Sequence, residues 1–469
     1  MHFPLRLVLA GLASTALAVQ ASDTHKHWPQ WRGPLANGVA PEAKPPVAWS
    51  ENSHVQWKFE IPGYGTSTPI IWEDRIFLLT AVPVAAKAAE TKPTPPAPQV
   101  TGNEPPRPGA GAGPRSGPGG GPPRGGGGGG MRSEAPSEPH RFLVLAVDRK
   151  TGRELWRKVA REEVPHEGHH RDHGFASHSP VTDGDGLYVN YGSRGLHAYD
   201  LQGNKRWEKD LGRMQTRNGF GEGGAPALHG NILVVNWDHE GEDFVAAFDK
   251  RTGKELWRQK RDEQTTWTTP LVVEHGGKAQ VVVSATQRVR SYDLESGKQV
   301  WECGGMTGNV IPTPVAAFGH VYAISGFRGA ALLAIKLGQE GDLTDSPAIT
   351  WKHAKNTPYV PSPLLYGERL YFFSGNNAML STFNAKEGKS LIDAERLTGM
   401  NGVYASPLGA DGRVYLVGRD GKTVVIKDAD TLEVLATNSL DDEFDASPAA
   451  VGTQLFLRGK KNLYCLGGG

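Results

Sequence analysis

The sequence predicts an all-β chain folded as an eight-bladed β-propeller with four strands in each blade. Three observations lead to this prediction. A small-residue and proline signature recurs along the chain, and a turn followed by tryptophan falls between its copies. A tryptophan-bearing run near the start also supplies a strand that the last repeat lacks. Beyond the first 21 residues, no long stretch carries the period of about 3.6 residues expected of a helix.

The first signature is a pair of small or polar residues followed by proline. Apart from the first interval, successive copies lie 41 to 49 residues apart. Each proline precedes a short apolar run, a turn and an alternating run such as Arg413 to Val417, which is typical of strands in a hairpin. Eight copies of a repeat of this length predict eight blades. The prolines are Pro69, Pro180, Pro226, Pro270, Pro314, Pro363, Pro407 and Pro448.

The second signature is a turn that starts with Asp, ends with Gly and leads to a tryptophan, as from Asp148 through Gly152 to Trp156. Glycine supplies the positive φ of such a turn. A large indole ring at the start of the outermost strand can wedge between neighbouring sheets. The tryptophans to which we assign this docking role are Trp57, Trp156, Trp207, Trp257, Trp301 and Trp351.

The two ends of the chain complement each other. The last repeat supplies three strands, whereas Val55 to Phe59 precedes the first signature and carries Trp57. We therefore expect the N-terminal strand to complete the last blade and close the ring, which removes exposed sheet edges.

Composition divides the remainder of the chain. Residues 1–21 have the charged start, apolar core and small residues of a cleaved signal peptide, so we expect a periplasmic or secreted protein. Residues 22–54 form an N-terminal arm, and residues 55–469 form the propeller. Residues 84–140 are rich in Gly and Pro and predict a disordered insertion in blade one.

The charge balance bears on the partners. Lys and Arg number 51 and Asp and Glu number 50, a net charge of +1, which does not favour a nucleic-acid partner. After the N-terminus, no run reaches the roughly 20 apolar residues of a membrane span.

The turns and their tryptophans resemble the tryptophan-docked, PQQ-like propellers of the quinoprotein superfamily, which includes pyrroloquinoline quinone (PQQ) alcohol dehydrogenases and the outer-membrane assembly factor BamB. The segments Trp28 to Pro34 and Gly219 to Gly223 are similar to those of exported PQQ-like repeat proteins. The resemblance implies the fold and the docking role of the tryptophans. The adjacent cysteine pair and the haem-attachment motif of the dehydrogenases have no counterpart in this sequence.

Because the sequence differs from the dehydrogenases in these motifs, we consider two functional hypotheses. The leading one is a non-catalytic binding or scaffold module for a protein or an extracellular ligand, which binds at the propeller mouth. The alternative is a PQQ-dependent dehydrogenase that oxidises an alcohol or a sugar, with PQQ and Ca²⁺ as cofactors.

The candidate ligand site lies where segments lead into the innermost strands, because these converge on the mouth of the channel. We expect Trp267 to supply a stacking face, Arg328 to pair with an anionic group, and Glu222 and Asn309 to supply oxygens for a cation or hydroxyls. Other residues assigned to this site are Arg194, Tyr359 and Tyr404, and the segment before Pro448 also places Asp445 at the mouth. The alternative interpretation is that the aromatic rings plug the channel.

Two further clusters are weaker candidates. Five of the 16 histidines fall between His166 and His178, and His169 and His173 could bind a metal ion such as Zn²⁺. We expect the ligand at the mouth and not at this histidine loop. Acidic residues from Asp238 to Asp243 could bind Ca²⁺, although a solvated turn is the simpler interpretation.

Overall fold

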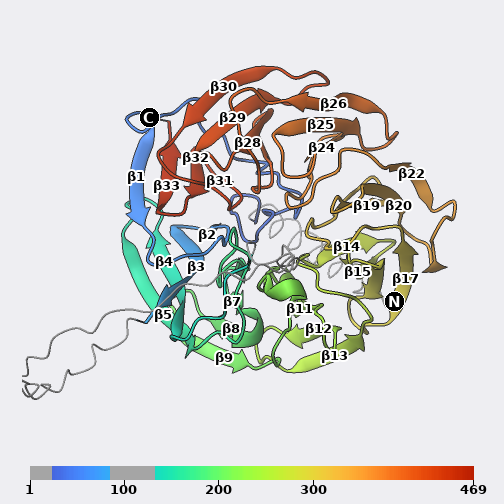
Figure 1. Cartoon of the computed structure of the whole chain (residues 1–469), viewed down its shortest axis with the longest axis horizontal. Helices are drawn as coiled ribbons and strands as arrows, with labels where there is room; N and C mark the ends of the chain where they lie inside the picture. The colour runs from blue at the N-terminus through green and yellow to red at the C-terminus, as the bar shows by residue number, and fades with distance from the viewer. Residues whose placement is uncertain (1–23, 85–131, 469) are drawn as a thin grey trace, which may run out of the picture.

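The computed structural model describes residues 24–84 and 132–468. They form an all-β propeller of eight sheets arranged around a central axis (Figure 1). The predicted fold class is therefore confirmed, including the join between the first strand and the last blade. The predicted signal peptide, residues 1–21, lies outside the described residues.

The first four blades run from the N-terminal part of the chain. Blade one consists of β2 (Ile70–Trp72), β3 (Arg75–Pro83), β4 (His140–Asp148) and β5 (Glu154–Glu163). Blade two consists of β6 (Val181–Thr182), β7 (Leu187–Asn190), β8 (Leu196–Tyr199) and β9 (Lys205–Lys209). Blade three consists of β10 (Ala227–His229), β11 (Ile232–Trp237), β12 (Phe244–Asp249) and β13 (Glu255–Lys260). Blade four consists of β14 (Leu271–His275), β15 (Lys278–Val283), β16 (Arg288–Asp293) and β17 (Gln299–Gly304), with β21 (Gly341–Asp342) added at its edge.

The other four blades complete the ring. Blade five consists of β18 (Val315–Ala317), β19 (His320–Ser325), β20 (Ala331–Lys336) and β22 (Ile349–His353). Blade six consists of β23 (Leu364–Tyr366), β24 (Arg369–Phe373), β25 (Met379–Asn384) and β26 (Ser390–Arg396). Blade seven consists of β27 (Leu408–Ala410), β28 (Arg413–Val417), β29 (Lys422–Lys427) and β30 (Val434–Ser439). Blade eight consists of β31 (Ala449–Val451), β32 (Gln454–Arg458), β33 (Asn462–Gly467) and β1 (Val55–Glu60).

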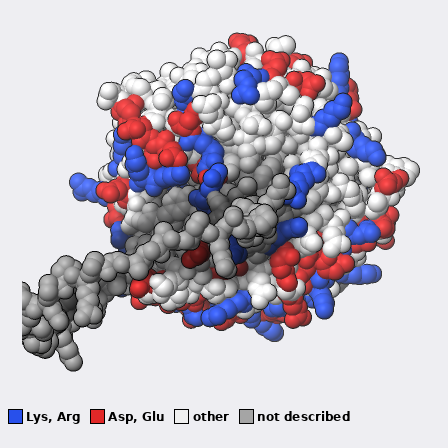
Figure 2. Space-filling view, in the orientation of Figure 1, with Lys and Arg blue, Asp and Glu red and all other residues white. Residues whose placement is uncertain are grey.

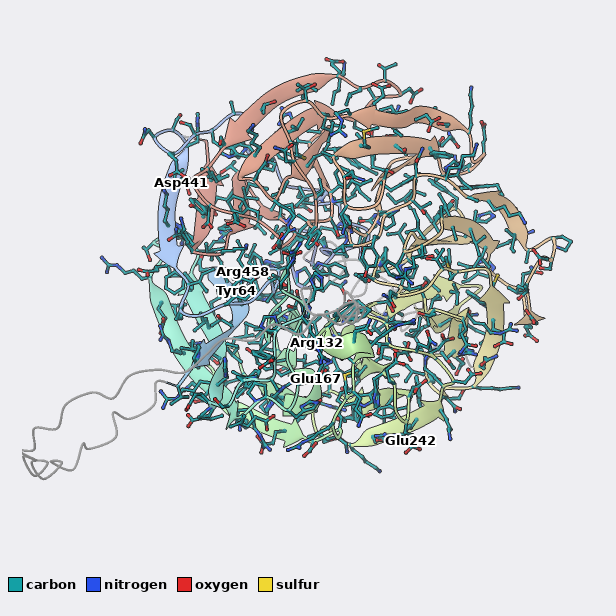
Figure 3. The ribbon with its side chains drawn as sticks, in the orientation of Figure 1. Tyr64, Arg132, Glu167, Glu242, Asp441 and Arg458 are labelled. Atoms are coloured by element: carbon teal, nitrogen blue, oxygen red, sulfur yellow. The ribbon has the colours of Figure 1, made fainter. Side chains whose placement is uncertain are left out.

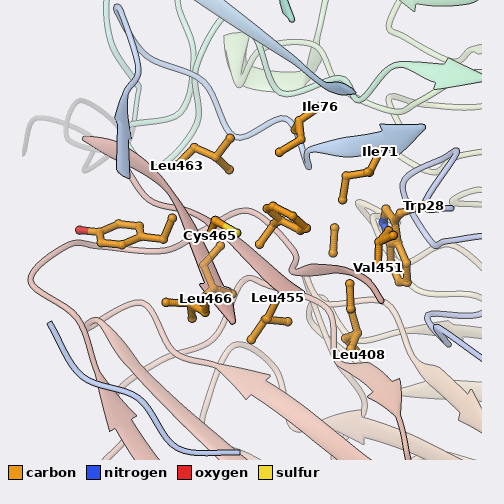
Figure 4. Packing of buried hydrophobic residues seen from close by; sticks show 14 of the residues in the cluster. Trp28, Ile71, Ile76, Leu408, Val451, Leu455, Leu463, Cys465 and Leu466 are labelled. Carbon is orange, nitrogen blue, oxygen red and sulfur yellow. The ribbon is translucent and has the colours of Figure 1, made fainter. Parts of the chain in front are cut away.

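Ring closure rests on the pairing of β1 with β33. The strands are antiparallel, with Trp57 opposite Cys465 and Phe59 opposite Leu463. Every second side chain of β1 is partly buried, so one face of the strand packs on the core and the other faces solvent. Figure 4 shows the side chains of β33 packed with Leu455 in this part of the core.

The first signature couples neighbouring blades through its hydroxyl groups. The backbone N–H of the second signature residue in one blade donates to the side-chain oxygen of the equivalent residue in the next blade. The chain of bonds lacks one link at Ala225, which has no hydroxyl group, and another at Thr68, whose Oγ1 has no partner among the described residues. The linked pairs are Thr68–Ser179, Ala225–Thr269, Thr269–Thr313, Thr313–Ser362, Ser362–Ser406 and Ser406–Ser447, at 2.9–3.0 Å.

Five of the six assigned tryptophans bind the next blade in the same way. In the closing contact, Trp57 Nε1 donates to the carbonyl of Arg149 at 3.0 Å. Its ring packs on Gly152, where a Cβ atom would lie only 2.6 Å from the indole. Gly152 also has φ of +70°, so the turn requires glycine for two reasons. The equivalent pairs of tryptophan and glycine are Trp156–Gly203, Trp207–Gly253, Trp257–Gly297 and Trp351–Gly388.

Trp301 does not make this contact with the next blade. Its Nε1 donates to Gln280 of its own blade at 3.2 Å, and the side chain is fully buried. The turn that follows in blade five is longer, and its strand β21 returns to pair with β17, placing Gly341 opposite Trp301. This added strand covers Trp301, so no turn glycine of the next blade packs on its ring.

The N-terminal arm crosses one face of the ring. Trp28 exchanges two backbone hydrogen bonds with Ile71 of blade one. Arg32, fully buried, donates to the carbonyls of Pro363 and Pro407, which lead into blades six and seven. Lys44 N donates to the carbonyl of Gly452 in blade eight. Blades six, seven, eight and one are consecutive in the closed ring, so the arm runs along this half of it.

Part of the predicted insertion is described. Strands β3 and β4 pair out to Pro83 and His140, so the insertion leaves blade one at the end of this hairpin. Residues 85–131 lie outside the described residues. At the C-terminal end of the insertion, Ser133 N donates to the carbonyl of His169 at 2.8 Å, and His169 N donates to Ser133 Oγ at 3.0 Å. This end is therefore held against the histidine segment.

Two surface properties complete the description. In residues 24–84 and 132–468, no helix has the length and apolar character needed to cross a membrane. On the face shown in Figure 2, acidic and basic side chains of the described residues are interspersed around the ring.

Candidate functional site

A cavity of about 240 Å³ is formed by segments that lead into the innermost strands, and Trp31 of the N-terminal arm also lines it. This is somewhat below the range of roughly 300–1,000 Å³ that is usual for small-molecule sites. The lining residues are Trp31, Thr66, Thr68, His170, Asp172, His173, Ser177, Ser179, Phe220, Gly223, Gly224, Ala225, Trp267, Thr269, Ile311, Tyr359, Val360, Tyr404, Asp445 and Ser447.

Three predicted aromatic residues line this cavity from three different connections between blades. Trp267 is held by its Nε1, which donates to the carbonyl of Gly221 at 2.8 Å. Tyr359 packs on Phe327 with ring centroids 4.8 Å apart. The rings of Trp267, Tyr359 and Tyr404 therefore surround a cavity and do not fill the channel completely.

An arginine and two carboxylates lie together beside Tyr404. Arg419 Nε binds Asp445 at 2.6 Å, and its Nη2 lies 3.1 Å from Asp172. The guanidinium lies over the ring of Tyr404, 3.9 Å from its centroid, and the Tyr404 hydroxyl donates to Asp172 at 3.1 Å. Burial raises the pKa of Tyr404 to about 12. Burial also raises the pKa of Asp445, and Arg419 partly offsets this effect.

The sequence analysis placed Asp445 at the mouth but did not assign Asp172 or Arg419 to the site. Asp445 directly precedes the last copy of the small-residue and proline signature, a position that points to the mouth. Arg419 follows Gly418, just as Arg328 lies in a Gly-flanked turn. These signals were available, but the pairing of Arg419 with Asp172 joins residues of blades far apart in the ring.

The histidine segment forms part of the cavity wall, so the mouth and this loop are not two separate places in the structure. His170, Asp172 and His173 all line the cavity. The reason is that residues 164–180 form the connection from β5 to β6 and reach across to blade seven, where Asp172 contacts Tyr404.

The predicted metal pair is not brought together as a ligand set. His169 does not line the cavity, since its Nδ1 lies 2.8 Å from the carbonyl of His170 and its ring packs edge-on against Phe175. Among the described residues, the group with ligand atoms close enough to share a metal ion is His166, Glu167 and Glu222.

Glu222 and Arg194 lie behind the cavity wall and not in it. Arg194 Nη1 binds Glu222 at 2.6 Å, and both side chains are 3% exposed. Ser193 N also donates to Glu222 at 2.6 Å. A buried carboxylate requires such partners, so Glu222 is directed to Arg194. The positive charge of Arg194 also disfavours a metal ion bound by His166, Glu167 and Glu222.

Asn309 and Arg328 lie next to lining residues without lining the cavity. Both adopt positive φ, +52° and +50°. Asn309 is 2% exposed, and burial raises the pKa of Tyr359, which the Asn309 side chain acts to lower. Arg328 is exposed and lies over the ring of Phe327, 5.2 Å from its centroid. The turn conformation thus directs Arg328 to the surface beside the mouth.

The unfolding free energy should depend on pH through His178, which directly precedes Ser179 in the wall. Burial, with smaller effects of His173 and Arg194, lowers its pKa to about 3. In the unfolded chain the pKa of this histidine is near 6.5, so between the two pKa values the unfolded chain binds one more proton than the folded chain. The unfolding free energy therefore has its full value above pH 6.5 and decreases as the pH falls. Between pH 7 and 5.5 we expect a loss of about 1 kcal/mol from this residue.

Urea unfolding of the parent and of His178→Gln at several pH values measures this contribution. The variant should show a shallower fall in unfolding free energy over the same interval. Equal slopes for the two proteins would contradict a neutral, buried His178.

The residues that line the cavity do not fit PQQ, the cofactor of the dehydrogenase hypothesis. PQQ is a flat quinone with three carboxylate groups, which requires cationic partners. The ionised side chains that line the cavity are Asp172 and Asp445, and the lining set contains no Lys or Arg. Both carboxylates are bound by Arg419, whose charge also opposes Ca²⁺ at this position.

Comparison with known proteins places the fold. A model of the family described as "Outer membrane protein assembly factor BamB" matches residues 140–216 and 201–407. No curated protein matches the sequence.

Several solved structures are similar. The quinohemoprotein alcohol dehydrogenase from Comamonas testosteroni has 10% identity and a TM-score of 0.57, covering 97% of this chain and 84% of that one. A europium-containing methanol dehydrogenase has 9% identity and a TM-score of 0.57, covering 95% and 92%. BamB from Moraxella catarrhalis has 12% identity and a TM-score of 0.49, covering 70% and 93%. At these identities, the two dehydrogenases show that the chain shares their fold.

Proposed function

This chain belongs to the PQQ-like propeller family described as outer membrane protein assembly factor BamB, and from that premise we propose that it is an exported binding module. Its ligand is an extracellular molecule that enters the cavity at the propeller mouth. The observation that carries this proposal is the convergence of Trp267, Tyr359 and Tyr404 from separate blade connections on one cavity.

The chemistry of the wall supports ligand binding. Flat aromatic faces and a few fixed polar groups are the usual composition of small-molecule sites. Asp172 and Asp445 are held by Arg419, so their free lone pairs keep one orientation. Such a preorganised wall reduces the entropy lost when a ligand binds.

Export rests on the signal-like pattern of residues 1–21. Mass spectrometry of the protein produced with its own leader tests this part. A mature N-terminus close to residue 22 in an extracytoplasmic fraction supports export, and an intact leader in the cytoplasm contradicts it.

Replacing Trp267 should weaken ligand binding. Loss of its stacking face in Trp267→Ala should reduce the affinity about tenfold or more, since aromatic contacts contribute roughly 0.5–1.5 kcal/mol beyond their buried area. The probes are a panel of neutral oligosaccharides, uronate oligosaccharides and short peptides, titrated by tryptophan fluorescence and by calorimetry.

Two controls accompany this variant. Trp267→Phe retains a flat ring and should retain most of the affinity. Phe318→Ala removes an exposed aromatic ring in the turn between β18 and β19 and should bind as the parent does. If no member of the panel binds the parent, or if Trp267→Ala binds every probe as the parent does, the proposed function is wrong.

A further inference from the structure

Three arginines lie around one side of the cavity mouth. Arg217 belongs to the short 3-10 turn Arg217–Gly219, which directly precedes the lining residue Phe220. Arg132 forms an isolated bridge with the lining residue His170, and its Nη1 lies against Gly219. Figure 3 shows Arg132 close to the centre of the ring, whereas Glu242 and Asp441 lie at its periphery.

The third arginine approaches from another blade. Arg328 lies over the ring of Phe327, which packs on the ring of the lining residue Tyr359. Burial raises the pKa of Tyr359, and the positive charge of Arg217 partly offsets this effect. The three guanidinium groups therefore flank Phe220 and Tyr359.

These arginines differ from the other arginine at the mouth. Arg419 is bound by two carboxylates, Asp172 and Asp445. For Arg132, Arg217 and Arg328, no carboxylate of the described residues lies within ion-pair distance, 4.0 Å. Arg217 instead donates to the amide oxygen of Gln264. Among the described residues, carboxylates therefore pair with the arginine on one side of the mouth and not with the three on the other.

The interior of the cavity offers hydrogen-bonding groups for hydroxyls. Ser179, Thr269 and Ser447 each accept a backbone N–H through the side-chain oxygen, which leaves their own O–H free to donate into the cavity they line. The carboxylates Asp172 and Asp445 can accept hydrogen bonds from hydroxyls. The aromatic faces of Trp267 and Tyr404 can pack on the C–H face of a pyranose ring.

From this arrangement we infer that the ligand is a uronic acid unit, free or at the end of an acidic polysaccharide, with its ring in the cavity and its single carboxylate among Arg132, Arg217 and Arg328. The inference rests on the proposed binding function and adds the class of ligand. A ligand with several carboxylates would place negative charge beside Asp172 and Asp445. A cationic ligand would pass three arginines and then meet carboxylates that Arg419 already binds.

The test compares an acid with its ester. Galacturonic acid and trigalacturonate are titrated into the full chain by calorimetry, beside their methyl esters, which keep the ring and hydroxyls but lose the charge. The parent should bind the acids at least about tenfold more tightly than the esters at low ionic strength. Rising salt should weaken acid binding and reduce this preference, because the arginines lie near the surface.

Substitutions of the arginines show which of them cause the preference for the acid. Arg217→Gln combined with Arg328→Gln should reduce the preference for the acid to near one, and adding Arg132→Gln should remove any remainder. Arg251→Gln replaces an exposed arginine in the turn between β12 and β13 and should retain the preference of the parent. Trp267→Ala should weaken binding of acid and ester together.

The outcomes separate the two proposals. Equal affinity for acid and ester in the parent, or a full preference in the triple variant, overturns the uronate inference while cavity binding stands. Binding of only neutral sugars or peptides from the panel also overturns it. Binding of trigalacturonate but not of the monomer assigns the ligand to a polysaccharide chain end, and binding of both assigns it to the uronate unit itself.

Discussion

A chain that begins at Ile61 should lose the cooperative unfolding of the propeller. This truncation removes β1 and the arm, and with them Trp57 and the buried Trp28 and Trp49. At roughly 1.5–3 kcal/mol for each large side chain, the loss reaches about 5 kcal/mol or more. The whole stability of a folded domain is about 5–15 kcal/mol. The truncation also exposes the edge of β33, so the product should associate.

Two longer chains separate the arm from the strand. A chain that begins at Thr24 keeps both and serves as the reference. A chain that begins at Ser53 lacks the arm but keeps β1, and its stability should be intermediate. Urea unfolding followed by tryptophan fluorescence, together with size-exclusion chromatography, provides the comparison. If the chain from Ile61 is monomeric and unfolds at the same urea concentration as the reference, ring closure by β1 contributes nothing.

Replacing Arg261 should destabilise the protein by about 3–5 kcal/mol, because a buried carboxylate is left without its partner. Asp238 and Arg261 have fully buried side chains, with Nε and Nη2 of the arginine 2.6 and 3.2 Å from the carboxylate. Arg261 Nη1 also donates to the Tyr292 hydroxyl at 2.7 Å. Burial acts to lower the pKa of Arg261, but the charges of Asp238 and Tyr292 raise it above its usual value.

The matching variants distinguish a broken pair from lost packing. Arg261→Ala should show the full loss in urea unfolding. Asp238→Asn combined with Arg261→Met removes both charges and should recover much of it. Arg157→Ala breaks a surface pair with Glu154 and should cost less than about 1 kcal/mol. A loss of less than 1 kcal/mol in Arg261→Ala would refute the importance of this buried pair.

This pair also settles the acidic turn that the sequence raised as a Ca²⁺ candidate. Asp238 is bound by Arg261 and accepts a hydrogen bond from Thr266 at 2.8 Å. Glu240 accepts from Thr265, and Asp243 accepts from the backbone of Glu263. These carboxylates therefore stabilise contacts within blade three and with the segment that leads to blade four. Their partners lie some 20 to 28 residues away, and no local pattern identifies them.

Local chemistry made the fold predictable. The carboxylate of Asp148 accepts the backbone N–H groups of Lys150 and Thr151, and Gly152 supplies the positive φ that ends this turn. These interactions span only a few residues, so the sequence displays them directly. The different contacts of Trp301 have the opposite origin, since β21, the strand that covers it, lies 40 residues further along the chain.

The candidate site was only partly predictable for the same reason. Trp267, Tyr359 and Tyr404 line the cavity, because each lies shortly before a proline signature and the ring brings these segments together. Glu222 was misplaced, since its direction depends on Arg194.

The sequence by itself determined the number of blades, the closing strand and the aromatic character of the mouth, because repeats, turns and strand alternation are local patterns. The tertiary structure alone decided which charges are paired. Arg419 is bound by Asp172 from a distant blade, whereas Arg132, Arg217 and Arg328 have no carboxylate of the described residues within 4.0 Å. Ion pairing depends on distances of a few ångströms between residues that are hundreds of positions apart in the sequence, and only the closed ring sets those distances.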